Sequence, residues 1–179
     1  VFGIKPSFGR VPVSPPSGAW SLSHIGPMAR TVEDAALALQ VSAGPDVHDQ
    51  YSLPHSGVDY LKNLRGSLKG WRIAWSDDLG FTKAMDPEVR SICARAARRF
   101  RDFGCRVDTV KPGWSNPQRA WEGLFCGGIA ARLEGALRTT RASIDPGIVK
   151  LIEKSQEWKR GHYIDSWFKR LDWNTGVQQ

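Results

Sequence analysis

The sequence VFGIKPSFGR at residues 1–10 opens the stretch that decides the fold. It continues through LSHIGPMAR at 22–30 and TVEDAALALQVSAGPD at 31–46. Phe2 and Ile4 share one face of an extended chain, so the first segment predicts a strand. The third segment has apolar residues at helical spacing. The stretch as a whole therefore predicts a strand, a loop rich in Pro, Ser and Gly, and a helix.

The boundaries of this first helix are marked by its terminal residues. Thr31 is a favourable N-cap, and Asp34 follows it at the position of a capping-box acid. Gly44-Pro45 supplies a helix-ending glycine followed by a helix breaker. The positions between them predict an apolar stripe made of Val32, Ala35, Ala36, Leu39 and Ala43.

A β-α-β unit is predicted over residues 71–110. Alternating apolar residues indicate a strand at 71–76, and a second strand is expected at 105–110. Asp86-Pro87 marks the start of a helix over 86–103, because Asp caps helices and Pro is favoured in their first turn. The length of the connection suits a parallel crossover.

The apolar face of this second helix is expected to be buried, with the arginines exposed. That face comprises Val89, Ile92, Ala96, Phe100 and Phe103. The connection after the first strand carries Asp77 and Asp78 where a nucleotide-binding unit would carry a glycine-rich loop. Two carboxylates repel phosphate, so we do not expect a nucleotide site.

The C-terminal part reads as helical. Asn116-Pro117 opens a helix that runs to about Arg138, and Asp145-Pro146 opens another that runs to about Arg160. Residues 162–173 continue or restart that helix. This last part is dense in large apolar side chains, nearly all of them aromatic: Trp158, Tyr163, Trp167, Phe168, Leu171 and Trp173.

Composition indicates an ordinary globular chain of 179 residues, 41% hydrophobic and 24% charged. No apolar run approaches the roughly 20 residues of a membrane span, so no membrane partner is expected. The net charge is +7, but the excess arginines are scattered, and we do not expect nucleic acid as a partner. Cys93, Cys105 and Cys126 have no paired spacing, which predicts buried thiols, a cytoplasmic location and no metal site.

Residues 1–54 closely resemble the segment that follows the nucleophile loop in amidase-signature hydrolases. The likeness extends to the β-α-β unit at 71–110 through WRIAWS and DPEVR, and it is weaker over 111–179. The resemblance implies an α/β fold with a mixed sheet covered by helices. It also implies one partial amidase domain over 1–179, with a helical segment at 116–179.

The resemblance implies amide C–N hydrolysis by acyl transfer from a Ser nucleophile. In the family, that Ser, a second Ser and a Lys lie in a segment that precedes the equivalent of Val1. The chain is therefore expected to be an internal fragment with no catalytic residue of its own, inactive in isolation and needing no cofactor. A fragment of the A-type component of an amidotransferase is an alternative, and a non-catalytic basic and aromatic binding module is another.

Several residues within the chain invite a catalytic or metal-binding interpretation. Lys5 belongs to the strand after the nucleophile in the family pattern, so we do not assign it as the base. Ser23, His24 and Asp34 are close in sequence, but the nucleophile elbow is missing, and His24 is expected to be a hydrogen-bonded loop residue. His48 lies among aspartates in a loop that is expected to be a surface turn.

The resemblance places segments after the β-α-β unit around the substrate channel. Trp121, Phe125 and Ile129 are spaced by four on the helix after Asn116, so they are substrate-pocket candidates, with core packing as the competing interpretation. The expected partner is a small-molecule amide in the intact parent. We also expect a homo-oligomer, because strand Val1–Ser7 and the aromatic end would expose pairing groups and apolar surface.

Overall fold

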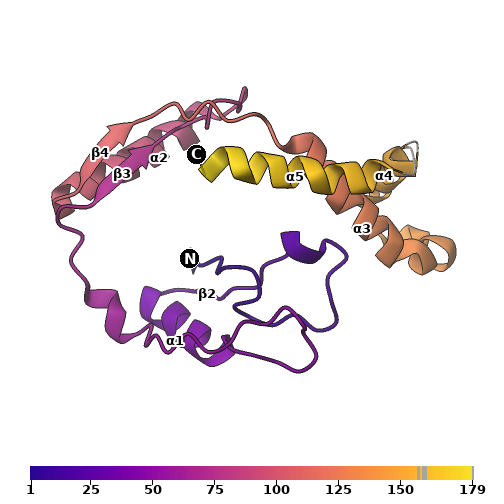
Figure 1. The fold of residues 1–179 in the computed structure, drawn as a ribbon, viewed down its shortest axis with the longest axis horizontal. Helices are drawn as coiled ribbons and strands as arrows, with labels where there is room; N and C mark the ends of the chain where they lie inside the picture. The colour runs from indigo at the N-terminus through magenta and orange to yellow at the C-terminus, as the bar shows by residue number, and fades with distance from the viewer. Residues whose placement is uncertain (157, 159–160, 179) are drawn as a thin grey trace. The chain divides into compact units, whose positions relative to one another are not determined.

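The computed structural model describes residues 1–156, 158 and 161–178 (Figure 1). It divides into two compact units. The first contains Val1–Arg65 and Glu122–Ile164, and the second contains Gly66–Trp121 and Asp165–Gln179. The chain combines helices with short strands, which confirms the α/β class.

The first unit begins with a short antiparallel pair of strands. β1 (Phe2–Gly3) pairs with β2 (Met28–Ala29), and Phe2 lies opposite Ala29. The Ile4 N–H extends the pairing by donating to the Pro27 carbonyl at 3.2 Å. The first strand therefore has a partner within the chain, so part of the pairing groups that the sequence analysis expects to be exposed are satisfied.

Helix α1 (Val32–Ser42) forms where the sequence predicts it. The Thr31 hydroxyl accepts a hydrogen bond from the Asp34 N–H at 3.0 Å, which satisfies one free donor of the first turn. Ala35, Ala36 and Leu39 are buried, which confirms the centre of the apolar stripe. Val32 is 41% exposed and does not belong to the core.

Two further helices lie wholly or mainly in the first unit. α3 (Gln118–Thr139) starts one turn earlier, in the second unit, and α4 (Pro146–Gln156) follows it. The Asp145 carboxylate accepts the N–H of Gly147 at 2.8 Å and so caps α4. The apolar core of these helices contains Leu124, Cys126, Val149 and Ile152. The expected continuation of α4 to Arg160 falls on residues 157, 159 and 160, which lie outside the described ones.

The second unit contains the predicted β-α-β arrangement. β3 (Arg72–Trp75) pairs in parallel with β4 (Arg106–Thr109), and α2 (Pro87–Arg99) connects them. The Asp86 carboxylate caps α2 by accepting the N–H of Glu88 at 2.7 Å. Gly104 ends the 3-10 turn that follows α2 with a φ of 80°. These boundaries confirm the sequence prediction.

The predicted burial of the apolar face of α2 is wrong. Val89 is 51% exposed, Ile92 48%, Phe100 39% and Phe103 58%, and Ala96 is exposed as well. Ala97 is the buried residue of this helix. The reason is geometric, because a sheet of two strands is too narrow to cover a helix face of this width.

Helix α5 (His162–Gln178) begins in the first unit and lies mainly in the second. The Trp173 indole N–H donates to the Ser115 carbonyl at 2.8 Å, and the Trp173 ring meets the Trp114 ring edge-on at 6.3 Å. Short 3-10 helices occupy Trp20–Leu22, Lys62–Arg65, Phe100–Phe103 and Arg141–Ser143. None of the helices in the described ranges is long and apolar enough to cross a bilayer.

Candidate functional site

A cavity of about 660 Å³ lies within the first unit. The loop before the first 3-10 helix, the Tyr51 loop, helix α3 and the start of α5 supply its walls. The lining residues are Pro16, Ser17, Gly18, Trp20, Gln50, Tyr51, Gly127, Gly128, Ala131, Arg132 and Tyr163. The walls are thus mainly apolar and aromatic, as in small-molecule sites of proteins.

The Gly127-Gly128 pair allows two segments to approach α3 at the cavity. A Cβ on Gly128 would lie 1.8 Å from the Gly18 carbonyl oxygen, and a Cβ on Gly127 would lie 2.8 Å from the Tyr163 ring. Two glycines inside a helix cost about 1 kcal/mol each relative to alanine. The close approach of the loop and of Tyr163 explains why the helix carries them.

Trp20 supplies an aromatic wall from a strained backbone. Its φ is 45°, a left-handed conformation that bulky residues adopt rarely and at a cost in free energy. The Trp20 ring lies 5.7 Å from the Tyr51 ring, and the Phe8 ring also lies 5.7 Å from the Tyr51 ring. The three rings support one another beside the cavity.

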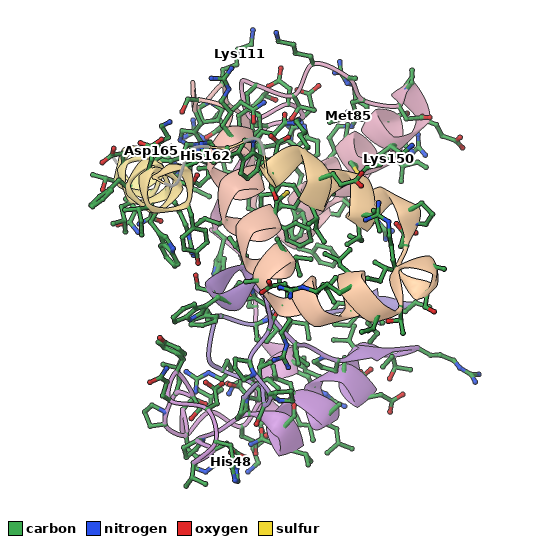
Figure 2. All side chains as sticks on the ribbon, turned by 90° about the vertical axis from the view of Figure 1, so that its right-hand side faces the viewer. His48, Met85, Lys111, Lys150, His162 and Asp165 are labelled. Atoms are coloured by element: carbon green, nitrogen blue, oxygen red, sulfur yellow. The ribbon has the colours of Figure 1, made fainter. Side chains whose placement is uncertain are left out.

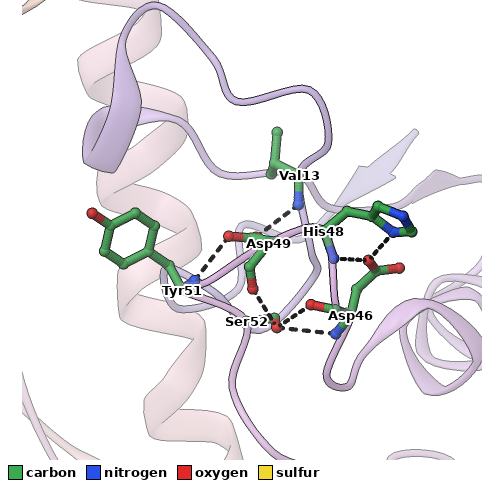
Figure 3. A network of polar contacts seen from close by, with 6 residues as sticks. All are labelled: Val13, Asp46, His48, Asp49, Tyr51 and Ser52. Atoms are coloured by element: carbon green, nitrogen blue, oxygen red, sulfur yellow. Dashed lines mark hydrogen bonds and ion pairs between the residues drawn. The ribbon is translucent and has the colours of Figure 1, made fainter.

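A network of polar contacts holds the Tyr51 loop in place (Figure 3). The Asp49 carboxylate accepts the N–H groups of Val13 and Tyr51, each at 2.9 Å. The Ser52 hydroxyl accepts the Asp46 N–H at 3.0 Å and donates to the Asp49 carbonyl at 2.7 Å. These side chains take the place of regular secondary structure in the Tyr51 loop. They join it to Val13, in the segment that leads into the loop at 14–20, called the Trp20 loop below.

The two aspartates next to His48 in the sequence, Asp46 and Asp49, both belong to this network of hydrogen bonds. The hydrogen bond that the His48 N–H donates to the Asp46 carboxylate holds the pKa of Asp46 below its ordinary value. His48 itself lies exposed in the loop after α1 (Figure 2). Among the described residues, no group of three or more His, Cys, Asp and Glu side chains is placed to hold a metal ion. The hydrogen bonds from the N–H groups of His48 and Tyr51 to the Asp46 and Asp49 carboxylates hold this loop as a turn.

A second cavity, of about 640 Å³, lies in the second unit between residues 112–120 and α5. Arg119, Lys169 and Asp172 line it together with Trp114 and Trp173. Its walls carry charges of both signs, whereas the first cavity is mainly aromatic and aliphatic. The first cavity is therefore the better candidate for an apolar organic ligand.

Comparison with known proteins decides the family. The family described as Amidase matches residues 1–178. The chain belongs to the amidase family. The cavity, with its glycine pair and aromatic walls, is therefore a feature of an amidase chain.

Two curated relatives illustrate the range of the family. An acylamidase of Rhodococcus erythropolis is 31% identical over 159 residues, which is 87% of this chain and 33% of the relative. The A-type component of glutamyl-tRNA(Gln) amidotransferase from Lactiplantibacillus plantarum is 37% identical over 117 residues, or 62% of this chain and 23% of the relative. The chain thus spans a third or less of the length of these relatives.

Solved structures agree with this assignment. A bacterial aryl acylamidase of the amidase signature enzymes is 26% identical and has a TM-score of 0.79. The match covers 97% of this chain and 38% of that one. A 6-aminohexanoate cyclic dimer hydrolase has a TM-score of 0.80 at 18% identity, over 98% of this chain and 39% of that one, and shows the shared fold.

The structure does not assemble the Ser-His-Asp relay that the order of residues suggests. The Ser23 hydroxyl donates to the Ser17 hydroxyl at 2.5 Å, and His24 Nδ1 lies 3.3 Å from the Leu22 carbonyl. Asp34 is exposed in the first turn of α1. His24 is thus the hydrogen-bonded loop residue that the amidase pattern implies, and its ring also meets a neighbouring phenylalanine ring edge-on at 5.9 Å.

None of the three predicted pocket residues lines the cavity. Phe125 and Ile129 are half-buried on the same helix, and Trp121 is 44% exposed in the part of α3 that belongs to the second unit. Their contact with substrate stays a prediction. The helical spacing of large side chains points to Trp121, Phe125 and Ile129 and gives no weight to Gly127-Gly128. Two glycines inside a helical pattern are nevertheless a signal of close packing.

The thiol at the centre of α3 is chemically quiet. Cys126 is 2% exposed, and burial raises the pKa of its thiol, with the negative charge of Glu122 acting in the same direction. A thiol nucleophile needs a lowered pKa and access to its substrate. Cys126 therefore acts as a small apolar core residue, and Cys105 is buried as well. Cys93 is exposed on α2, so its predicted burial is wrong for the same reason as that of the rest of its helix face.

Proposed function

We propose that this chain forms the substrate-binding part of an amidase that hydrolyses an amide C–N bond. The observation that carries the proposal is the cavity of about 660 Å³, walled by Trp20, Tyr51 and Tyr163, in a chain of the amidase family. An aromatic cavity of this size holds the aryl or acyl part of a small amide. The wider match to an acylamidase than to an amidotransferase component supports hydrolysis.

The proposed reaction is acyl transfer. A serine attacks the amide carbonyl, the amine leaves with a proton, and water releases the acid from the acyl-enzyme. Backbone N–H groups stabilise the tetrahedral oxyanion. In this proposal the nucleophile and its base belong to a segment other than residues 1–179, and the cavity positions the amide for attack.

We also propose that the regions 1–54, 71–110 and 116–179 belong to one amidase domain, and that the protein is cytoplasmic. The continuous family match over 1–178 supports the first statement. The free thiols of Cys93, Cys105 and Cys126 support the second, because disulfides are rare in reducing compartments.

The alternative of a nucleic-acid-binding module has less support. Lys159 and Arg160, two of the cations that it needs, lie outside the described residues. Lys169 is paired with Asp165 at 2.5 Å, and Arg170 lies 5.3 Å from the centre of the Trp167 ring. Cations engaged in local contacts are poor candidates for phosphate binding.

The test is hydrolysis by the complete gene product. We expect it to release aniline from short-chain and aryl anilides, and we expect a serine-directed sulfonyl fluoride to abolish the activity, because the acyl-enzyme requires a free serine. Liquid chromatography of the released amine measures the rate. A purified, folded protein with no turnover on anilides, aliphatic amides or carbamoyl compounds would contradict the proposal.

A further inference from the structure

Arg132 is the charged residue among the described residues that line the cavity. It follows Gly128 by one helical turn, so both lie on the face of α3 that meets the Trp20 loop. A Cβ built on Gly18 would lie 3.0 Å from the Arg132 Cβ. The side chain thus starts beside the loop wall, and it is exposed to solvent at the cavity.

Two acidic residues of the first unit already have partners. Glu134, which is on the same helix, is paired with Arg138. Asp49, two residues before Tyr51, accepts the N–H groups of Val13 and Tyr51 at 2.9 Å. Within the described part of the chain, Arg132 has no carboxylate partner.

The position of this charge has a consequence for the ligand. A guanidinium stays protonated at any ordinary pH, so the cavity carries a permanent positive charge. Apolar walls strengthen the interaction of that charge with an anion, relative to open water. An aromatic cavity with one cation therefore favours a ligand that has an apolar body and one anionic group.

We propose that Arg132 is a specificity residue that selects amides whose acyl part carries a carboxylate. The inference rests on the proposed amidase function. The planar guanidinium matches a carboxylate in a two-point contact, whereas Trp20, Tyr51 and Tyr163 contact the apolar part of the ligand. Arg132 takes no part in the bond-breaking step.

The experiment compares two anilides that differ only at the end of a four-carbon acyl chain. Succinanilate ends in a carboxylate, and butyranilide ends in a methyl group. In the complete gene product, Arg132→Met should lower kcat/KM for succinanilate about tenfold, because a charge-assisted contact is lost. The value for butyranilide should change less than about twofold, because no charge meets Arg132 in that complex.

Two further variants and a change in salt concentration extend the comparison of the two anilides. Arg132→Lys should retain part of the preference, because it keeps the charge and loses the planar fork. Arg138→Met, on the same helix and away from the cavity lining, should leave the ratio of the two kcat/KM values unchanged. Raising salt from about 0.1 to about 1 M should reduce the wild-type preference, because screening weakens exposed charge pairs.

Each outcome decides the matter. A succinanilate-to-butyranilide ratio that Arg132→Met leaves unchanged would overturn the role of Arg132 while the amidase function stands. If both anilides turn over slowly, their inhibition constants against the best amide substrate give the same ratio. A protein that cleaves no amide at all would overturn the proposed function, and the role of Arg132 with it.

Discussion

Gly128→Ala is expected to destabilise the protein and, under the proposed function, to remove most of the amidase activity of the complete gene product. Alanine in a helix interior is ordinarily better than glycine by about 1 kcal/mol. Here the new methyl group would lie 1.8 Å from the Gly18 carbonyl oxygen, so the Trp20 loop must move away from α3. We expect a net loss of about 1–3 kcal/mol, the range for overpacked sites.

The loss of activity follows from the same displacement. Trp20 and Gly18 both line the cavity, and a shift of about 1 Å in a substrate-positioning wall can cost about a hundredfold in rate. Thermal unfolding and kcat/KM on anilides measure the two effects in the complete gene product.

Gly135→Ala is the matched control on the same helix. A Cβ at Gly135 meets nothing within 4 Å, so this variant should gain up to about 1 kcal/mol and keep full activity. Equal gains in stability at positions 128 and 135 would show that the loop does not pack against α3 as described.

Gly9→Ala should destabilise the protein by roughly 3 kcal/mol or more, from clash and backbone strain together. Gly9 has a φ of 78°, and its Cβ would lie 2.1 Å from the Tyr51 carbonyl oxygen. Its own carbonyl accepts the Leu53 N–H at 2.8 Å, so the segment cannot retreat without losing that bond. Urea unfolding measures the change in free energy.

Gly57→Ala separates the cost of backbone strain from the cost of the steric clash. Gly57 has a similar φ of 67°, with nothing within 4 Å of an added Cβ. The Gly57→Ala variant should therefore lose only the free energy that backbone strain costs, about 1 kcal/mol. Similar losses at Gly9 and Gly57 would mean that contact with the Tyr51 loop adds nothing to the cost.

Local signals predict much of this fold. Thr31 and Asp86 cap their helices, and Pro87 and Gly104 mark a start and an end, because each acts on backbone groups only a few residues away. The parallel pairing of β3 and β4 was predictable for a related reason, since the helix between them sets the crossover.

The burial of the apolar side chains of α2 was not predictable from their helical spacing. The spacing of Val89, Ile92 and Phe103 shows that they share a face, but the width of the sheet beneath decides how much of that face is covered. The site was missed for another reason. Gly127, Gly128 and Gly18 act through the absence of a side chain, and only the folded chain shows which segments approach them.

The central claim is that the aromatic cavity beside Gly128 binds the amide. Trp20→Ala tests it most directly, with Trp71→Ala as the control, because Trp71 is 61% exposed in the second unit and lines neither cavity described above. In the complete gene product, Trp20→Ala should lower kcat/KM for aryl anilides about tenfold with little change in melting temperature, as loss of an aromatic contact predicts. Trp71→Ala should leave kcat/KM within about twofold of wild type, as expected for a surface change. Equal kcat/KM values for the two variants, at unchanged stability, would contradict the assignment of the cavity as the substrate site.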